Sequence, residues 1–490
     1  MNILLVEPRT PETFWSLRHA LRFVGKRAAN PPLGLLTMAG LLPREWSCRL
    51  VDRNTTDLPD TDLAWADFVM VSAMEIHRGE VTELARRCRA LGRPLIGGGP
   101  LFMPEPDASL GVPHVVVGEA EELAAELVAD LRAGTLRPLY QAPRFPDLSL
   151  TPLPRWDLLD LRLYATMSVQ SCRGCPFDCE FCDVVALNGR RPRVKSPAQF
   201  IAELEALRVL GWQGPVFVVD DNFIGDPRRT RELLMAIIDW RARTRTRMTF
   251  LTEASVNMAA EPELLDLMVT AGFKKVFLGL ETPSAESLRE CRKLQNLRGD
   301  LAQSVSTIQA AGLEVMGGFI VGFDSDEPDI FQRQYEFIQK AGVVTAMVGL
   351  LQAMPRSRLY QRLAGEGRLR TESHGDNTSV VFNFEPRLDR EFLIDNYRRL
   401  MCRLYEPGAY YDRIRIFLDA HRMRGPRTPV SWPDVGAGFR SAWVMGIAHR
   451  GRRAYWRFVL STLTRHPDQF GVAMTLAIMG HHFRRVAAEL

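Results

Sequence analysis

The 490-residue chain contains only eight cysteines, and this scarcity excludes the small secreted proteins that depend on disulfide frameworks. The first residues, MNILLVEP, lack the basic segment and long apolar core of a secretion signal and are typical of a first β-strand. We therefore expect a cytoplasmic protein in a reducing compartment. Closely spaced thiols in such a compartment serve as metal ligands or redox centres rather than as disulfides.

The chain also lacks repeats, low-complexity segments and long hydrophobic runs. Its longest apolar stretch near the end, FGVAMTLAIMG at 470–480, is shorter than the roughly 20 residues that a transmembrane helix needs. Lys and Arg number 62 against 58 Asp and Glu, so the net charge of +4 gives no reason to expect a nucleic-acid partner. A length of 490 residues allows two or three domains with ordinary cores.

Four of the eight cysteines lie within residues 171–183, SCRGCPFDCEFCD. Cys175, Cys179 and Cys182 have C-x3-C-x2-C spacing, and three thiolates leave one iron of a cubane cluster without a protein ligand. Catalytic metal sites keep such an open position, whereas structural sites are closed. A four-ligand site that also uses Cys172 remains an alternative at this point. The other four cysteines are isolated and are interpreted as buried or idle thiols: Cys48, Cys88, Cys291 and Cys402.

Residues 1–145 alternate short runs of Val, Ile and Leu with amphipathic stretches. Strands without in–out alternation, separated by helices, predict a parallel sheet that is buried on both faces. We expect an open, doubly wound α/β domain that binds ligands at the carboxyl ends of its strands. The proline-rich stretch 141–160 is the predicted linker, with the domain boundary near residue 146. The predicted strands are NILLVEP, CRLVD, DFVMVSA, PLIGGG and HVVVGE.

Strands and helices alternate again from about 165 to 355, and six strand candidates there predict a partial (β/α)6 barrel of the TIM type as the domain over residues 146–365. Its active site is expected at the C-terminal mouth, and the cysteine loop follows the first of its strands. Residues 366–490 form a third, small and mainly helical domain of unclear role. Its basic and aromatic tail favours a helical lid, with contact to an anionic membrane surface or an acidic substrate as alternatives. His481 and His482 have no partner at ligand spacing, so we expect no second metal there.

The segment RGCPFDCEFC after the first barrel strand resembles the radical S-adenosylmethionine (SAM) superfamily. In that family three cysteines hold a [4Fe–4S] cluster, and the fourth iron takes the amino and carboxylate groups of SAM. The resemblance implies that Cys175, Cys179 and Cys182 are the ligands and that Cys172 is a bystander, although relatives commonly carry Ser or Thr near that position. It also implies SAM contacts at the later strand ends, where single polar groups equally suit ordinary turns. These expected contacts are Asp220, Asp221, Asn222, Glu253, Ser255, Glu281, Gly318 and Gly322.

A doubly wound domain ahead of such a barrel resembles the cobalamin-binding subgroup of this superfamily, in the stretches VSAMEIHRG (71–79), GGGP (97–100) and VGEAEE (117–122). Many cobalamin proteins use a D-x-H-x-x-G histidine as the lower cobalt ligand. Here Glu75 stands in place of the Asp and Gly79 comes one residue early, so His77 is interpreted as a rim or surface histidine. The resemblance implies a rim for the corrin that comprises Ser72, Ala73, Met74, Gly97, Gly98, Gly99, Pro100, Gly118 and Glu119.

These resemblances predict a cobalamin-dependent radical SAM methyltransferase that methylates an unactivated carbon of a small molecule. Hopanoid and bacteriochlorophyll methylases are among the relatives, which favours a lipid-like or polycyclic substrate. A flavodoxin or ferredoxin type of protein would supply electrons, and peripheral membrane contact is compatible with the basic tail. The alternatives are a cobalamin enzyme that does not methylate, such as an oxidative cyclase or rearrangement enzyme, and a non-catalytic iron–sulfur electron carrier.

Overall fold

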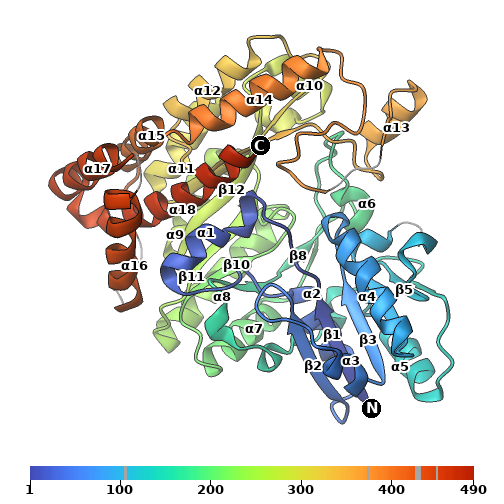
Figure 1. Ribbon diagram of the computed structural model, residues 1–490. Coiled ribbons are helices and arrows are strands. Elements are labelled where there is room, and N and C mark those ends of the chain that lie inside the picture. The colour runs from blue at the N-terminus through green and yellow to red at the C-terminus, as the bar shows by residue number, and fades with distance from the viewer. Residues whose placement is uncertain (104–106, 372–374, 425–431, 449–450) are drawn as a thin grey trace.

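The computed structural model describes residues 1–490 apart from 104–106, 372–374, 425–431 and 449–450. Its first layer is a parallel six-stranded sheet in the order β2-β1-β3-β4-β5-β6 (Figure 1). The strands are β1 (Asn2–Glu7), β2 (Ser47–Asp52), β3 (Phe68–Ser72), β4 (Leu95–Gly98), β5 (His114–Val117) and β6 (Leu139–Gln141). The helices between them are α2 (Leu33–Leu41), α3 (Asp60–Trp65), α4 (Arg78–Ala90) and α5 (Ala124–Ala133).

Both faces of this sheet are buried, as the runs of Val, Ile and Leu predict. Leu4 and Val6 of β1 pack with α4 in one core, while Ile3 and Leu5 pack with α2 and α5 in another. From β1 the chain adds β2 on one side and β3 to β6 on the other, so the strand order switches direction between β1 and β3. Ligands of doubly wound sheets bind at such a switch, outside the carboxyl ends of the strands. The doubly wound architecture is confirmed.

The second sheet consists of six parallel strands in sequential order, β7-β10-β11-β12-β13-β14. This arrangement confirms the predicted partial barrel, because β7 and β14 are its two unpaired edges within the described part of the chain. The strands are β7 (Met167–Val169), β10 (Pro215–Val218), β11 (Thr249–Ala254), β12 (Phe273–Glu281), β13 (Glu314–Val321) and β14 (Ala346–Leu350). The outer helices are α7 (Pro197–Val209), α8 (Pro227–Thr244), α9 (Pro262–Ala271), α10 (Ala285–Glu290), α11 (Leu301–Ala311) and α12 (Ile330–Lys340).

Helix α7 illustrates how local sequence determines an element of the barrel. Ser196 caps the helix by accepting a hydrogen bond from the amide of Gln199, and Pro197 occupies the first helical position. Phe200, Leu204 and Leu207 follow at helical spacing and are fully buried in the barrel core. These contacts hold the helix against β7 and α8, next to the cysteine loop.

A short antiparallel ribbon, β8 (Cys172–Arg173) with β9 (Arg193–Val194), encloses the cysteine loop and helix α6 (Val184–Asn188). Beyond the barrel the chain is helical, and no helix among the described residues is long and apolar enough to cross a membrane. These helices are α13 (Arg358–Gly365), α14 (Arg390–Leu404), α15 (Pro407–Ala420), α16 (Trp432–Trp443), α17 (Arg452–Arg465) and α18 (Phe470–Glu489), with a π-helical segment at Val444–Ala448.

The N-terminal segment 13–28, which contains α1 (Arg18–Leu21), leaves the first sheet and packs in the core of the barrel and the C-terminal helices (Figure 1). Phe14 stacks on Phe483 of α18 with ring centroids 4.1 Å apart, and the Nε2 atom of His482 lies 3.1 Å from the carbonyl oxygen of Thr13. The first 145 residues therefore do not form one self-contained core.

Candidate functional site

Cys175, Cys179 and Cys182 lie between β8 and α6, half-buried on one loop. Among the described residues, their three sulfur atoms do not all lie within 4.8 Å of one another. A single tetrahedral zinc ion with bonds of about 2.3 Å would bring the three sulfurs to about 3.8 Å. Three thiolates on one loop are also the protein ligands of a cubane cluster that keeps one iron open, each thiolate binding a different iron. The donor set therefore fits a [4Fe–4S] cluster better than one metal ion.

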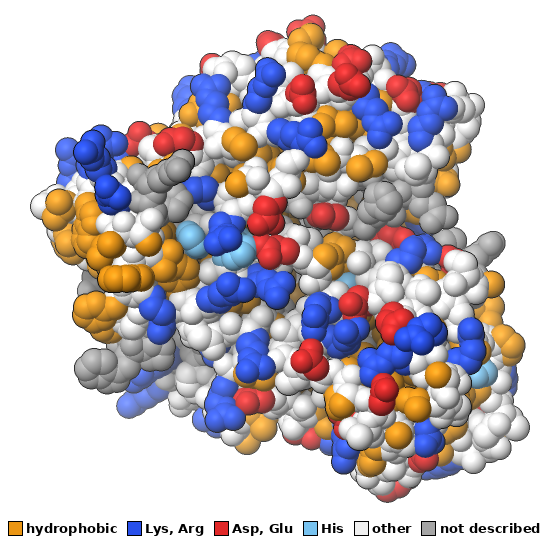
Figure 2. Space-filling model, in the orientation of Figure 1, with side chains coloured by type: hydrophobic (Ala, Val, Ile, Leu, Met, Phe, Trp, Pro, Cys, Tyr) orange, Lys and Arg blue, Asp and Glu red, His pale blue; other side chains and the backbone are white. Residues whose placement is uncertain are grey.

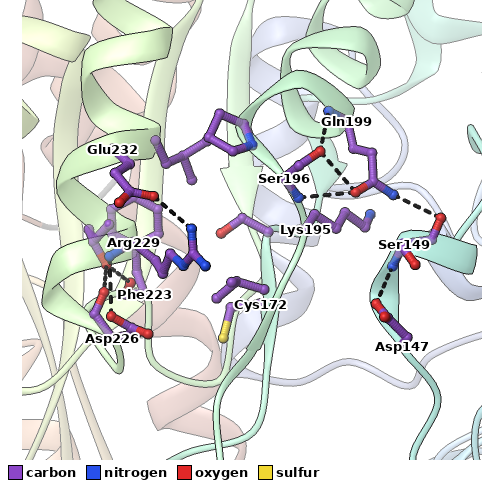
Figure 3. Close-up of a pocket in the computed structure, with 15 residues that line it drawn as sticks. Asp147, Ser149, Cys172, Lys195, Ser196, Gln199, Phe223, Asp226, Arg229 and Glu232 are labelled. Atoms are coloured by element: carbon purple, nitrogen blue, oxygen red, sulfur yellow. Dashed lines mark hydrogen bonds and ion pairs between the residues drawn. The ribbon is translucent and has the colours of Figure 1, made fainter.

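Cys172 is placed differently from these three cysteines. It belongs to β8, is 3% exposed, and its pKa is raised by burial and by the neighbouring carboxylate of Asp220. Its side chain lines a pocket of about 250 Å³. Figure 3 shows its sulfur between the start of α8 near Asp226 and the start of α7 near Ser196. Cys175, Cys179 and Cys182 do not line this pocket. This placement supports the prediction that Cys172 is not a ligand.

Two adjacent carboxylates at the end of β10 hold the backbone of the cysteine loop. Asp220 accepts hydrogen bonds from the amides of Ser171 (2.7 Å) and Cys172 (3.0 Å), as well as from the Ser171 hydroxyl. Asp221 accepts from the amide of Gly174 at 2.7 Å and from the side chain of Asn188. Both residues were expected to contact SAM, yet in the structure their carboxylates bind the loop that carries the ligands.

The acidic side chains of the loop are in turn paired with arginines from a distant segment. Asp178 lies 2.7 Å from Arg358, and Glu180 lies 2.7 Å from Arg362, both on α13. Asp183 lies 3.5 Å from Arg356, whose guanidinium also donates to the carbonyl oxygen of Pro100 at 3.1 Å. Arg356 therefore connects the cysteine loop with the first sheet.

Asn222 and Ser255, also expected at the SAM site, are neighbours at the ends of β10 and β11. The Nδ2 atom of Asn222 lies 3.2 Å from the Ser255 hydroxyl and 4.0 Å from the sulfur of Cys175. Glu253 lies beside them, and burial together with the charges of Asp221 and Asp220 raises the pKa of its carboxyl to about 7. This polar group next to the cysteine loop could bind the charged part of a ligand.

Glu281 ends β12 with φ of 62°, a left-handed conformation that is strained for a residue with a side chain. Its carboxylate lies 2.7 Å from the ammonium of Lys293. Burial alone would lower the pKa of Lys293, but the charges of Glu281 and of the Cys179 thiolate raise it above its ordinary value. Sequence reasoning missed this lysine, which lies in a region without a recognisable motif.

The two glycines expected at the adenine leave little space for a side chain. A Cβ atom on Gly318 would lie 2.8 Å from the ring of Phe277, and one on Gly322 would lie 2.9 Å from Phe382. Gly322 also has φ of 104°, and its amide donates to Asp326 at 2.8 Å. Both positions therefore require glycine for packing, whether or not adenine lies beside them.

An apolar wall, formed by Trp15, Phe277 and Met347, faces the lumen of the barrel. Val276, Leu278 and Leu280 of β12 point outward and are fully buried under the helices, so the alternate residue Phe277 points inward. Trp15 of the N-terminal segment packs edge-on against Phe277 at 5.4 Å, and its indole lies 3.0 Å from the sulfur of Met347. The N-terminal segment thus supplies an aromatic side chain to the interior of the barrel.

The residues expected at the corrin rim gather at the carboxyl ends of β3, β4 and β5. Ser72, Ala73 and Met74 follow one another at the end of β3, and Met74 is 51% exposed. Gly99 has φ of 92°, and a Cβ atom there would lie 2.8 Å from the carbonyl oxygen of Ala73. Gly118 also has a positive φ, with open space beside it. This edge therefore offers exposed backbone over which a flat ligand could lie.

The neighbouring glycines differ in their surroundings. The ring of Phe102 fills the space beside Gly97, at 2.5 Å from an added Cβ atom, whereas Gly98 lies in ordinary contact with β5. Pro100 begins a turn of 3-10 helix, and its carbonyl oxygen accepts from Arg356. Gly97 is thus required by internal packing, whether or not a ligand lies beside it.

Glu119 takes part in an ion-pair cluster between the two sheets, here named the Glu119 clamp, with Arg173 and Arg193. Its carboxylate is 9% exposed and contacts the guanidinium groups of both arginines. Arg173 is also paired with Glu121 at 2.8 Å. The charge of Glu119 is therefore compensated by the β8–β9 ribbon, so the side chain is engaged between the domains.

His77 was expected at the rim or at the surface, and the surface alternative is wrong because the side chain is buried. It is 1% exposed, its Nδ1 atom accepts from the amide of Met74 at 3.3 Å, and its Nε2 atom lies 3.1 Å from the Thr10 hydroxyl. Burial lowers the pKa of His77 to about 4. The ring thus stays neutral and holds the loop after β3.

Stability of the protein should depend on pH through His77. In the unfolded chain its pKa is about 6.5, so below that pH the unfolded state binds a proton that the folded state takes up only near pH 4. The free energy of unfolding should therefore fall by about 2 kcal/mol between pH 7 and pH 5 on account of this residue. His77→Gln should remove that part of the dependence in urea denaturation. His114→Gln on β5 serves as the control, and an unchanged pH profile in H77Q would contradict the prediction.

Comparisons with known proteins agree with this geometry. Residues 169–338 match the radical SAM superfamily, and residues 357–490 match a domain of unknown function, DUF4070. An uncharacterised methyltransferase of Synechocystis is 39% identical over 99% of this chain and 91% of its own length. The hopanoid C-2 methylase of Rhodopseudomonas palustris is 34% identical over 100% of this chain and 94% of its own.

Two solved structures show a similar fold. The radical SAM methyltransferase TsrM of Kitasatospora setae, solved with cobalamin and a [4Fe–4S] cluster, has a TM-score of 0.60 at 16% identity over 99% of both chains. The cobalamin-dependent radical SAM enzyme OxsB has a TM-score of 0.63 at 14% identity, over 100% of this chain and 80% of its own. The chain belongs to the radical SAM superfamily, in the family of methyltransferases that includes the hopanoid C-2 methylase.

Proposed function

We propose that the protein is a cobalamin-dependent radical SAM methyltransferase that methylates an unactivated carbon of a lipid-like or polycyclic molecule. The observation that carries this proposal is Arg356, which contacts Asp183 of the cysteine loop and the carbonyl oxygen of Pro100 at the edge of the first sheet. It joins the expected cluster site to the expected cobalamin site. A reaction that uses both groups on one substrate needs them close together.

The residues divide among three binding sites in this proposal. Cys175, Cys179 and Cys182 would hold the [4Fe–4S] cluster. The residues around SAM would be Asn222, Glu253, Ser255, Glu281, Gly318 and Gly322, with Asp220 and Asp221 holding the loop. Cobalamin would lie on Ser72, Ala73, Met74, Gly97, Gly98, Gly99, Pro100, Gly118 and Glu119. When bound, these groups supply a carbon-centred radical that removes hydrogen from the substrate and a methyl group that replaces it.

The chain itself binds, orients and excludes water. Lys293 places a positive charge near the thiols. The negative charges of Glu281, Cys179 and Cys182 all raise its pKa, so its ammonium stays protonated. The carboxyl of Glu253, with its pKa raised to about 7, is able to hold a proton or release it beside Asn222 and Ser255, which would bind SAM. Trp15 and Phe277 close one side of the lumen with apolar surface, which protects a radical from water.

The nature of the acceptor is supported by the relatives and by this lining. The hopanoid C-2 methylase, similar over 94% of its own length, is named for its action on hopanoids. The apolar wall formed by Trp15, Phe277 and Met347 suits a hydrophobic ring system. Because the first step consumes an electron, the enzyme would need a donor of the flavodoxin or ferredoxin type.

The test is anaerobic reconstitution with iron, sulfide and cobalamin, followed by SAM, dithionite and a hopanoid lipid. About four irons and one cobalt per chain, with 5′-deoxyadenosine, S-adenosylhomocysteine and a product heavier by one methyl group, would support the proposal. Formation of 5′-deoxyadenosine without S-adenosylhomocysteine would instead indicate a cobalamin enzyme that does not methylate. Zinc in place of iron, or iron without cleavage of SAM, would refute the radical chemistry.

A further inference from the structure

Helices α16 and α17 and the π-helical segment between them carry exposed apolar side chains on their outer side. Val435, Phe439, Trp443 and Ile447 recur at every fourth position, so they lie along one face. On α17 the exposed apolar side chains are Trp456, Leu460 and Leu463, which also share one face. We name these seven residues the apolar face.

The two halves of the apolar face are continuous. The indole nitrogen of Trp456 donates to the carbonyl oxygen of Gly446 at 2.9 Å, and its ring lies directly over that glycine. Trp456 therefore joins α17 to the segment that carries Trp443 and Ile447. Figure 2 shows hydrophobic side chains gathered over these helices at the left edge of the molecule, beside a group of basic side chains.

Exposure on this face is high and concentrated. Of the nineteen large hydrophobic side chains that are exposed among the described residues, seven lie here, including the two tryptophans of that set. Phe439 is 75% exposed, Trp443 is 65% and Leu460 is 61%. Single exposed hydrophobic residues need no explanation, but a contiguous group of this size marks an interaction surface.

The opposite side of the same helices is firmly packed, so the exposure does not come from a loosely attached segment. Tyr455 and Phe458 of α17 are buried, and Phe458 stacks on Tyr411 of α15 at 4.7 Å. The Ser441 hydroxyl lies 2.9 Å from the Tyr455 hydroxyl, and Arg440 donates to the carbonyl oxygen of Phe23 at 2.7 Å. The apolar face is therefore presented on a rigid support.

Charge on the helices that carry the apolar face is almost entirely of one sign, while exposed Asp412 and Asp419 lie on the neighbouring α15. Residues 434–448 and 451–465 contain five arginines, at 440, 452, 453, 457 and 465, against a single acidic residue, Asp434. Arg452, Arg453, Arg457 and Arg465 are exposed, and none of them forms an ion pair with a described residue. Aromatic and aliphatic side chains bordered by arginines are the composition of helices that lie in a membrane interface.

We propose that the apolar face docks on an anionic lipid bilayer, with α16 and α17 lying in the plane of the interface. Trp443 and Trp456 would enter the headgroup region, while the four arginines would contact anionic headgroups. A second copy of the chain fits this surface less well, because a two-fold contact would bring the unpaired arginines of both copies together. The proposal does not depend on the cofactors or on the reaction.

The test is co-sedimentation of the reconstituted protein with vesicles of phosphatidylglycerol and phosphatidylcholine, compared with vesicles of phosphatidylcholine alone. We expect binding to the anionic vesicles that weakens as salt is raised. The double variant Phe439→Ser/Trp443→Ser and the triple variant Arg452→Gln/Arg453→Gln/Arg457→Gln should each bind about tenfold more weakly or worse. Circular dichroism would establish that the variants are folded.

A matched control removes exposed hydrophobic side chains elsewhere. Val209→Ser and Met235→Ser, on α7 and α8, change residues that are 70% and 59% exposed and should leave vesicle binding unchanged. The proposal is overturned if the unaltered protein does not bind anionic vesicles, or if the control variants lose binding to the same extent. It is also overturned if light scattering shows a dimer that F439S/W443S dissociates while vesicle binding is absent, because the face would then be a contact between copies.

Discussion

Replacing Cys179 with alanine is expected to reduce the reconstituted protein from about four irons per chain to fewer than one and to abolish cleavage of SAM. The same result is expected for Cys175→Ala and Cys182→Ala. Each thiol would hold a different iron of the cluster, so no neighbouring side chain can take its place. Iron analysis and the absorption of the reconstituted cluster would measure the loss.

Cys172→Ala is the matched control, because it removes a cysteine three residues from the first ligand. Its sulfur lies at a separate pocket, so the variant should keep about four irons and form 5′-deoxyadenosine at a similar rate. Cys291→Ala, which changes another buried thiol, should behave likewise. Loss of iron in C172A with retention in C175A would show that the ligand set has been assigned incorrectly.

Residues of the site that lie close together in the sequence could be predicted, whereas those far apart in the sequence could not. Cys175, Cys179 and Cys182 lie within eight positions, and their spacing alone indicates a metal site. Lys293 and Arg356 lie more than a hundred residues beyond the loop, and nothing in their local sequence marks them. Only the closure of the barrel brings their charges to the cysteine loop, so they became visible only in the structure.

The same reasoning applies to the fold. The main strands of both sheets follow from continuous apolar runs, and the start of α7 follows from a serine and a proline at fixed positions. The strand β6 (Leu139–Gln141) and the β8–β9 ribbon escaped prediction, because two or three residues give no periodicity. The packing of Phe14 on Phe483 joins the two ends of the chain, which is a long-range contact that no local pattern encodes.

For polar residues at strand ends, the sequence could not distinguish a side chain that binds a ligand from one that binds the protein backbone. Asp220 and Asp221 lie at the expected edge, yet their carboxylates bind the amides of Ser171, Cys172 and Gly174. A carboxylate at the end of a strand indicates a polar function without saying whether a ligand or the backbone is its partner. Glu119 is the clearest case, because it was expected at the corrin and its carboxylate is paired with two arginines of the protein.

Glu119→Gln is expected to lower the free energy of unfolding by about 3–5 kcal/mol, the usual cost of breaking a buried ion pair on one side. The substitution would leave Arg193 without a charged partner in the Glu119 clamp, whereas Arg173 keeps Glu121. Urea denaturation of the apoprotein would measure the change, since a purely cobalamin-binding role for Glu119 would leave apoprotein stability unaltered. Glu122→Gln, whose partner Arg144 is 77% exposed, should cost less than about 1 kcal/mol.

The double variant Glu119→Gln/Arg193→Met separates the loss of the ion pair from other effects of the substitution. Methionine removes the charge that E119Q leaves uncompensated, so the double variant should recover a large part of the stability lost in E119Q. Recovery would show that Glu119 acts by neutralising the ribbon between the two sheets. If the double variant is as unstable as the sum of the two single variants, the clamp does not act as a unit. A loss of cobalamin affinity in E119Q with unchanged stability of the apoprotein would show that Glu119 acts only at the corrin rim.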